Sequence, residues 1–146
     1  MSMFLRKSIF IMTVALMSLN LMAAEKPIYT SNNAAVSGYD TVAYFTEGKP
    51  VKGQKSIEFK YLGVKWLFSS EANRALFVAD PVKYAPQYGG HCAFAMANDN
   101  LVSADPMAFT IVNDKLYLNY SLAVKKRWSK DIAGYIVDAD EYWNAL

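Results

Sequence analysis

Two stretches of the chain alternate hydrophobic and polar positions, and each stretch predicts a β-hairpin. In the first, Ile57, Phe59 and Tyr61 alternate with polar residues, and a Leu-Gly pair follows. In the second, an Asn-Asp-Lys sequence separates two apolar runs. Side chains of a strand point alternately to its two faces, so this spacing suits strands with one buried face. The predicted strands are 57–61, 64–68, 109–112 and 116–119.

Helices are predicted where apolar residues recur three and four positions apart. Ser69 or Ser70 precedes one such segment and Ser121 another, and serine hydroxyls commonly cap helix N-termini. Asp40 is the expected N-cap of an earlier helix, and Gly134 is expected to break the chain before the last helix. The predicted helical segments are 38–45, 71–79, 82–85, 121–130 and 135–146.

The order of these elements predicts one small α+β domain over residues 35–146, with two β-hairpins and several short helices. The apolar segment 91–97 fits either a strand or a helix, because periodicity does not distinguish them over so few residues. A turn is expected at 105–106, where Asp precedes Pro. Residues 25–34 are polar and are expected to form a loose leader in front of the domain. No repeat is visible in the sequence.

The first 24 residues differ in character from the rest of the chain. Arg6 and Lys7 precede an uncharged apolar run at 8–22, and Ala23 and Ala24 close it. These are the parts of a secretory signal peptide, and the run is shorter than the roughly 20 residues of a membrane-spanning helix. We therefore expect residues 1–24 to be a cleaved signal peptide and the mature protein to be periplasmic or secreted. The mature chain is expected to have no membrane span.

The charge balance changes when this segment is removed. The full sequence has 15 Lys and Arg and 13 Asp and Glu. Arg6 and Lys7 lie in the expected signal peptide, whereas every acidic residue follows it, so the remainder is formally neutral. Binding to a nucleic-acid backbone rests on a clustered positive surface. We therefore expect no nucleic-acid partner.

Cys92 is the only cysteine of the chain, and it lies beside the only histidine, His91. A lone cysteine cannot form an internal disulfide, and an accessible thiol in an oxidising compartment is open to exchange and oxidation. Met96 follows four residues later, which is the same face of a helix or of a strand. Thiolate, imidazole and thioether groups suit Cu(I). Cys92, His91 and Met96 are therefore the candidate metal ligands, and copper is the candidate cofactor.

The turn before this cluster supplies candidate binding residues, namely Tyr88, Gly89 and Gly90. Adjacent glycines allow a tight turn and a close approach of the backbone to a ligand. A structural role stays open for the sulfur residues, since free cysteine is among the most buried residue types and methionine commonly fills gaps in cores.

No motif for enzymatic catalysis stands out. The chain contains no phosphate-binding loop, no dinucleotide glycine fingerprint, no GxSxG and no HExxH. A Cys–His hydrolase needs the imidazole within hydrogen-bond reach of the thiol, and immediate neighbours in sequence rarely achieve that geometry. We therefore expect a protein that is not an enzyme.

Four segments resemble the exported, stand-alone YHS-domain proteins of bacteria. They read AVSGYDTVAYFTEGKPVKG, YLGVKWLF, FVADPVKYAPQYGGHCAFAMA and LYLNYSLAVKKRWSKDIAGYI. The resemblance implies a compact α+β domain related to treble-clef-like, metal-binding modules, with Cys92 at a family position. Metal-binding members carry cysteines in the hairpin and at the start of the next helix, where this chain has Ser69 and Ser70. A tetrahedral zinc site of the cysteine-rich type therefore cannot form here from one Cys and one His alone.

Two functions remain open at this point. The first is a periplasmic or secreted binding protein that handles copper through Cys92, with a metal ion or a metal-handling protein as its partner. The alternative is a metal-free domain that has lost the family's cysteine site and binds a protein or a small ligand through aromatic residues. The candidates for that surface are Tyr39, Tyr44, Trp66, Tyr84 and Tyr88.

Overall fold

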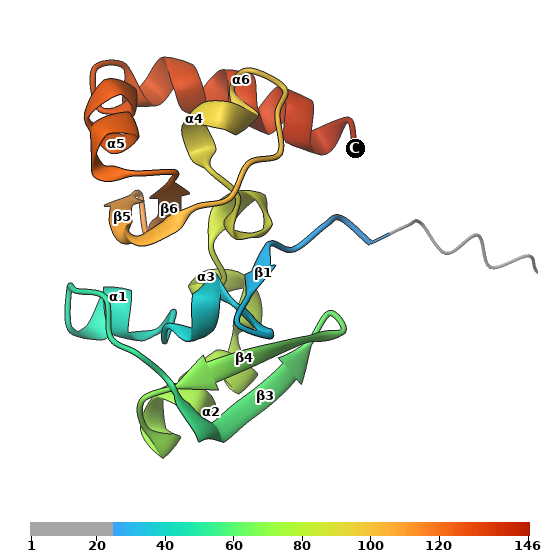
Figure 1. The fold of residues 1–146 in the computed structure, drawn as a ribbon, viewed down its shortest axis with the longest axis vertical. Coiled ribbons are helices and arrows are strands. Elements are labelled where there is room, and N and C mark those ends of the chain that lie inside the picture. The colour runs from blue at the N-terminus through green and yellow to red at the C-terminus, as the bar shows by residue number, and fades with distance from the viewer. Residues whose placement is uncertain (1–24) are drawn as a thin grey trace, which may run out of the picture.

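The computed structural model describes residues 25–146, and the expected signal peptide lies outside the described residues. Three two-stranded antiparallel sheets and several short helices form a small α+β domain, as predicted. Figure 1 shows the hairpin β3–β4 in one half of the molecule and β5–β6 in the other, where α4, α5 and α6 cover it. The elements are β1 (Thr30–Ser31), β2 (Ala34–Ala35), turn η1 (Val36–Gly38), α1 (Ala43–Thr46), β3 (Gln54–Tyr61), β4 (Val64–Phe68), α2 (Glu71–Ala79), α3 (Pro81–Tyr84), turn η2 (Gln87–Gly90), α4 (Ala93–Met96), β5 (Asp105–Val112), β6 (Lys115–Asn119), α5 (Leu122–Trp128) and α6 (Ile132–Asn144).

The two halves repeat one arrangement of elements, although no repeat is visible in the sequence. We call residues 36–84 unit one and residues 88–144 unit two. Each begins with a left-handed turn, continues through a one-turn helix into a hairpin, and ends with helices. In both hairpins a strand of 8 residues pairs with one of 5, and the register shifts after the first pair. The predicted hairpins are thus two copies of one structure.

Helix caps occupy equivalent positions in the two units. The Oγ atoms of Ser70 and Ser121 each accept a hydrogen bond from the amide three residues later, at 3.1 Å. Asp80 and Asp131 cap the following helices in the same way, at 3.2 and 3.1 Å. Because each cap satisfies an otherwise unpaired N–H, the caps fix where the helices of both units begin.

Core aromatic residues are also equivalent. Trp66 lies on Phe77 in unit one with ring centroids 5.0 Å apart, and Tyr117 lies on Trp128 in unit two at 5.5 Å. Phe77 and Trp128 are fully buried. Offset ring packing of this kind adds to the burial of apolar area, so each unit has its own aromatic centre.

Strand β6 joins the two cores. Leu116 and Leu118 pack in the hydrophobic cluster of unit one, whereas Tyr117, which lies between them, packs in the cluster of unit two. Alternate residues of a strand face opposite sides, so one strand can serve two cores. The units therefore share apolar packing rather than folding as separate domains.

Asp40 ties the start of unit one to its hairpin. Its Oδ1 accepts hydrogen bonds from the amides of Val42 and Ala43 at 2.9 and 3.3 Å. The prediction that Asp40 is the N-cap of a helix was wrong, because α1 starts only at Ala43 and its N-cap is Val42. Its Oδ2 accepts from the amide and the hydroxyl of Ser69 at 2.8 and 2.6 Å, and from Asn73 Nδ2 at 2.8 Å. The carboxylate is fully buried, and these five donors compensate for its loss of water.

Three other local predictions were wrong. Residues 25–34 are not loose: Tyr29 N donates to Gly89 O at 2.9 Å, and β1 pairs with β2. Gly134 does not break the chain, because helix α6 begins at Ile132 and Gly134 N is the group that Asp131 caps. The segment 105–106 belongs to strand β5 instead of forming a turn.

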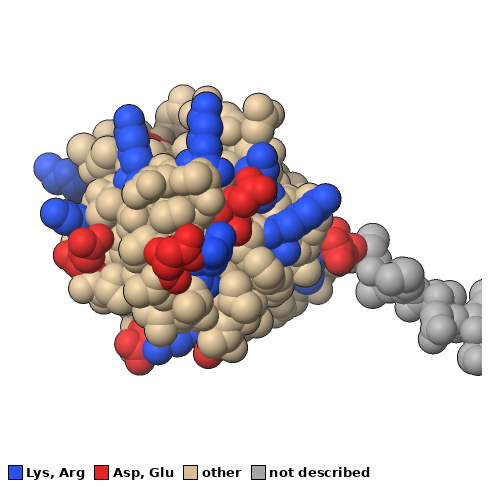
Figure 2. Space-filling view, turned by 90° about the horizontal axis from the view of Figure 1, so that it is seen from below, with Lys and Arg blue, Asp and Glu red and all other residues tan. Residues whose placement is uncertain are grey.

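Charged side chains are mixed on the surface. On the face that Figure 2 shows, Lys and Arg stand between Asp and Glu and do not gather in a patch of one sign. Within residues 25–146, none of the helices has the length and apolar character needed to cross a membrane.

Candidate functional site

The segment predicted to carry the chemistry follows turn η2. Cys92 N donates to Val102 O at 2.9 Å, and Cys92 forms an isolated parallel bridge with Leu118 of strand β6. In unit one, Asp40 N donates to Val51 O at 2.8 Å. Cys92 and Asp40 therefore occupy equivalent positions after equivalent turns. The segment 91–97, which the sequence left open between strand and helix, contains the one-turn helix α4.

The Cys92 thiol faces the protein interior. Cys92 is 1% exposed, and its Sγ lies 3.6 Å from Asn119 Oδ1, to which it donates. The same oxygen accepts a hydrogen bond from Phe94 N at 3.1 Å, which fixes the orientation of the amide. Asn119 is fully buried at the end of β6, and its Nδ2 has no hydrogen-bond partner among the described residues. In this state the thiol is a hydrogen-bond donor inside the core.

His91 is held by the turn that precedes it. Its Nδ1 lies 2.8 Å from Tyr88 O, so this nitrogen carries the proton and donates it. The ring stands beside those of Tyr29 and Trp143, at centroid distances of 5.9 and 6.3 Å. Burial lowers the pKa of His91, and the hydrogen bond to the Tyr88 carbonyl opposes this in part. The imidazole is therefore neutral at pH 7.

The third candidate ligand, Met96, is a core residue. It is 1% exposed and packs in the cluster that contains Tyr88 and Trp128. Its amide donates to Cys92 O at 3.0 Å, so both residues lie on one helical turn, as their spacing predicts. Throughout residues 25–146, no three His, Cys, Asp or Glu side chains are close enough to share a metal ion.

Turn η2 receives the chain's own N-terminal segment. Tyr88, Gly89 and Gly90 all have positive φ, at 57°, 60° and 81°. A Cβ atom on Gly89 would lie 2.2 Å from Pro27 O, so only glycine allows this contact. The close backbone approach expected at the glycines is thus made by residues 27–29 of the same chain. We call residues 25–29 the strap.

Tyr88 itself points toward helix α6. Its hydroxyl donates to Asp140 Oδ1 at 2.9 Å. Burial, followed by the hydrogen bond to Asp140, raises the pKa of Tyr88 well above its ordinary value. The phenol stays protonated and keeps turn η2 attached to the last helix.

A mostly apolar cavity of about 400 Å³ opens where the strap, turn η2 and helix α6 meet. Lys26 donates a hydrogen bond to Trp143 O, and its Nζ lies 5.5 Å from the centroid of the Trp143 ring. The cavity takes ring surface from both units, since β3 and β4 contribute as well. Its aromatic lining residues are Tyr61, Trp66, Tyr88 and Trp143.

The sequence identified only part of this lining. Trp66 and Tyr88 were candidates for an aromatic surface and do line the cavity, although both are core residues that are only 2% and 3% exposed. Tyr44 and Tyr84 are buried in the core of unit one. Trp143 and the strap were not identified. Their contribution depends on contacts between the two ends of the chain, and no local pattern indicates such contacts.

Comparison with known proteins identifies a family for residues 42–88. Residues 42–88 match the YHS domain, which corresponds to most of unit one and ends at the turn that opens unit two. Searches of curated proteins and of solved structures returned no match. The hairpin β3–β4 and the capped helix α2 lie within the matched range, and unit two repeats this arrangement outside it. Residues 42–88 of the chain therefore form a YHS domain.

Proposed function

We propose that this protein is an exported, non-enzymatic binding protein that takes a small planar, mainly apolar ligand into the aromatic cavity. The observation that carries the proposal is the contrast between the two candidate sites. The cavity is open and has the partly exposed rings of Tyr61 and Trp143 in its lining, whereas the Cys92 thiol is buried and hydrogen-bonded to Asn119. Small-molecule sites are typically concave, mostly apolar and about 300–1,000 Å³ in volume, and the cavity falls in this range.

The lining favours a flat ligand with one polar end. The rings of Tyr61 and Trp143 offer faces on which another ring can stack, and Ile28 and Val82 add apolar surface. Lys26 provides an ammonium group at the rim, so an acidic substituent on the ligand would have a charged partner there. An aromatic carboxylate such as indole-3-acetate or benzoate combines these features.

We assign no catalytic step to the cavity. Neither Cys92 nor His91 lines it. The proton-bearing nitrogen of His91 faces Tyr88 O and not the thiol, so the pair lacks the nucleophile–base hydrogen bond of a Cys–His hydrolase.

Export would place the new amino terminus at this cavity. Glu25 and Lys26 line it, and cleavage after Ala24 would make Glu25 the first residue of the mature protein. The proposal therefore includes a periplasmic or secreted location. N-terminal sequencing of the protein recovered from a periplasmic fraction tests that part separately.

Ligand titration tests the binding function. Indole-3-acetate, benzoate and the uncharged indole are added to isotopically labelled protein, and the indole N–H signal of Trp66, which also lines the cavity, is followed by NMR. We expect saturable shifts that Trp143→Ala abolishes and that Leu122→Ala leaves unchanged, since Leu122 is exposed on α5 outside the cavity. An absence of shifts with all three probes, or equal shifts in both variants, would overturn the proposal.

Copper binding is the second candidate, because Cys92 and Met96 lie on one helical turn beside His91. Binding would require the thiol to leave Asn119 and become accessible. A Cu(I) competition titration on reduced protein, with Cys92→Ser, His91→Ala and Met96→Leu alongside, separates the two functions. Tight binding that disappears in Cys92→Ser would favour copper, and binding no stronger than that of Cys92→Ser would favour the metal-free function.

A further inference from the structure

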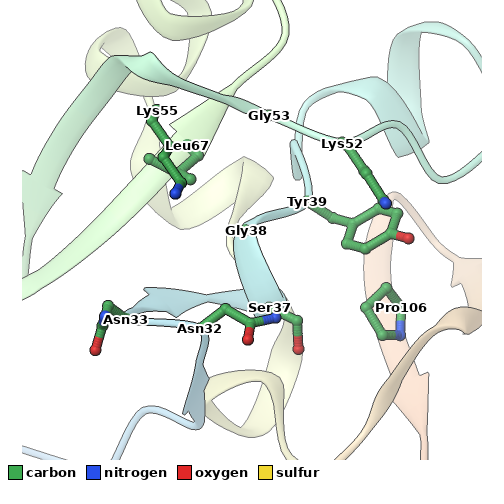
Figure 3. Close-up of a pocket in the computed structure, with 10 residues that line it drawn as sticks. All are labelled: Asn32, Asn33, Ser37, Gly38, Tyr39, Lys52, Gly53, Lys55, Leu67 and Pro106. Carbon is green, nitrogen blue, oxygen red and sulfur yellow. The ribbon is translucent and has the colours of Figure 1, made fainter.

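A second cavity, of about 610 Å³, lies in unit one and is more polar than the first, with a lining that is about evenly divided between polar and apolar surface. It is bounded by turn η1, by the β1–β2 turn and by the chain that leads into β3. Figure 3 shows the two lysines on opposite sides of the cavity, Lys55 beside Leu67 and Lys52 beside the Tyr39 ring, with Ser37 and the two asparagines along another border. The residues that bear on its chemistry are Asn32, Asn33, Ser37, Tyr39, Lys52 and Lys55.

The cavity carries positive charge without a compensating carboxylate in its lining. Neither Lys52 nor Lys55 forms an ion pair within residues 25–146, where the ion pairs are Lys65–Glu58 and Arg74–Glu71. The acidic residue next to Tyr39 in sequence is Asp40, which is buried and bonded to five donors.

On the other side, Asp105 precedes the lining residue Pro106 and accepts a hydrogen bond from Met107 N at 2.9 Å. A concave surface lined by one sign of charge concentrates ions of the other sign. The cavity therefore favours an anion.

Neutral polar groups line the cavity together with the two lysines. The side chains of Asn32, Asn33 and Ser37 make no hydrogen bond to any other described residue, although all three line the cavity. Amide and hydroxyl groups can both donate and accept, which suits the hydroxyls of a ligand. Tyr39 adds a ring face and a phenol. This combination fits a ligand that is hydroxylated as well as charged.

In unit two, the place that corresponds to this cavity, next to turn η2, is filled by the strap. The counterpart of Ser37 is Gly89, and the direction of its absent Cβ is occupied by Pro27 O. The counterpart of Tyr39 is His91, beside which the Tyr29 ring stands at 5.9 Å. In unit two the strap therefore covers the left-handed turn. In unit one no described segment covers it, and the cavity is left open.

We propose that this cavity binds an anionic sugar, that is, a saccharide that carries a carboxylate or a phosphate. The ammonium group of Lys52, beside Tyr39, holds the charged substituent, Lys55 adds positive charge from the other side of the cavity, and Asn32, Asn33 and Ser37 hydrogen-bond the ring hydroxyls. The Tyr39 ring packs on the apolar face of the sugar. This site is separate from the aromatic cavity, so either proposal can fail without the other.

The test uses glucuronate and glucose 6-phosphate as probes, with glucose and inorganic phosphate to separate the contributions of the sugar and of the charge. Binding is measured by calorimetry and by NMR shifts of the amides of Asn33, Ser37 and Gly38. We expect both anionic sugars to bind and to shift these amides, while glucose and phosphate bind at least about tenfold more weakly.

Charge variants locate the effect. The double variant Lys52→Gln/Lys55→Gln is expected to weaken binding by about tenfold or more, since it removes the charged partner at Lys52 and the added positive charge at Lys55. Ser37→Ala should weaken it to a smaller extent. Lys115→Gln/Lys126→Gln removes the same charge from unit two and should bind as the unaltered protein does.

Three results would overturn the proposal: no binding of either anionic sugar, equal weakening in the two double variants, or phosphate binding as tightly as glucose 6-phosphate. Unfolding curves of each variant show whether the fold is intact. Ser37→Ala keeps the test valid if the lysine variant is unstable.

Discussion

Units one and two have the same arrangement of elements, but the residue two positions after the left-handed turn differs between them: it is Asp40 in unit one and Cys92 in unit two. After the left-handed turn, unit one has Asp40, whose carboxylate accepts five hydrogen bonds, and unit two has Cys92, whose thiol donates one. The charged acceptor ties turn, hairpin and helix together within unit one. In unit two a weaker thiol–amide contact does part of this work, and the strap and helix α6 cover the turn from outside. The comparison indicates that the same arrangement of elements can be stabilised either by a buried carboxylate, as in unit one, or by packing of the strap and helix α6 on the turn, as in unit two.

The same comparison distinguishes the two cavities. The strap covers turn η2 and forms the apolar cavity with α6, whereas turn η1 stays uncovered and borders the polar one. The repeated structure thus borders two cavities that differ in polarity. The difference arises from what lies over each turn and not from the turn itself, because the φ angles of η1, at 52°, 53° and 83°, match those of η2 closely.

The largest expected effect concerns the aromatic centres. Phe77→Ala and Trp128→Ala should each lower the free energy of unfolding by about 3–5 kcal/mol, because each removes a fully buried ring. Since β6 contributes to both cores, we expect a single transition in each variant when urea unfolding is followed by circular dichroism and by fluorescence. A remaining transition from the unaltered unit would contradict the shared core. Val82→Ala, at an exposed position, is the control and should change stability by less than about 0.5 kcal/mol.

The next effect compares the two central residues directly. Asp40→Ala should cost about 2–4 kcal/mol, because several buried donors lose their acceptor. Cys92→Ala should cost only about 1 kcal/mol, since it removes one sulfur atom and one weak hydrogen bond. Denaturant unfolding measures both losses, and equal decreases in the free energy of unfolding would contradict the prediction that Asp40 stabilises unit one more than Cys92 stabilises unit two.

A third prediction tests the strap. Gly89→Ala should cost about 1–2 kcal/mol and release residues 25–29, because the new Cβ would collide with Pro27 O. Gly48→Ala is the matched control: its φ is +69°, but nothing lies within 4 Å of the new Cβ. Limited proteolysis should cut the strap faster in Gly89→Ala than in Gly48→Ala. Equal rates would mean that the strap does not depend on Gly89.

The smallest expected effect is a pH dependence confined to unit two. Burial lowers the pKa of His91 in the folded state, so below about pH 6.5 the unfolded chain binds a proton that the folded chain does not. Stability should therefore decrease as the pH falls from 8 to 5. His91→Phe, which places an aromatic ring where unit one has Tyr39, should reduce this decrease. Urea unfolding at pH 8, 6 and 5 measures it, and identical pH profiles for the two proteins would refute the prediction.

Local features of the fold could be predicted from the sequence. The hairpins follow from alternation of apolar and polar residues, and the starts of α2 and α5 follow from Ser70 and Ser121, since these signals act within a few residues. Gly134 shows the limit of such signals. It suggested a break, but a Cβ there would lie 2.3 Å from Asp131 Oδ2, so the capped first turn of α6 favours glycine.

Features that depend on distant contacts could not be predicted. The repeat is not visible in the sequence because equivalent positions share a burial state and not a residue type. Phe77 and Trp128, for example, are both fully buried aromatic residues at equivalent positions. The candidate ligands Cys92 and Met96 were placed correctly on one face, yet their burial depends on Asn119 and Trp128, which come later in the chain. The cavities need segments that meet only after folding, such as the strap and Trp143.

The bond between Lys26 and Trp143 brings the first described residues against the last helix. After cleavage of the expected signal peptide, the two ends that meet in this way can be closed by a short linker and the chain reopened elsewhere. Opening it between α3 and η2 would yield a circular permutant in which unit two is synthesised before unit one and the strap becomes an internal connection. The order in which the two units are synthesised would then be reversed, while the contacts between them in the folded protein would stay the same.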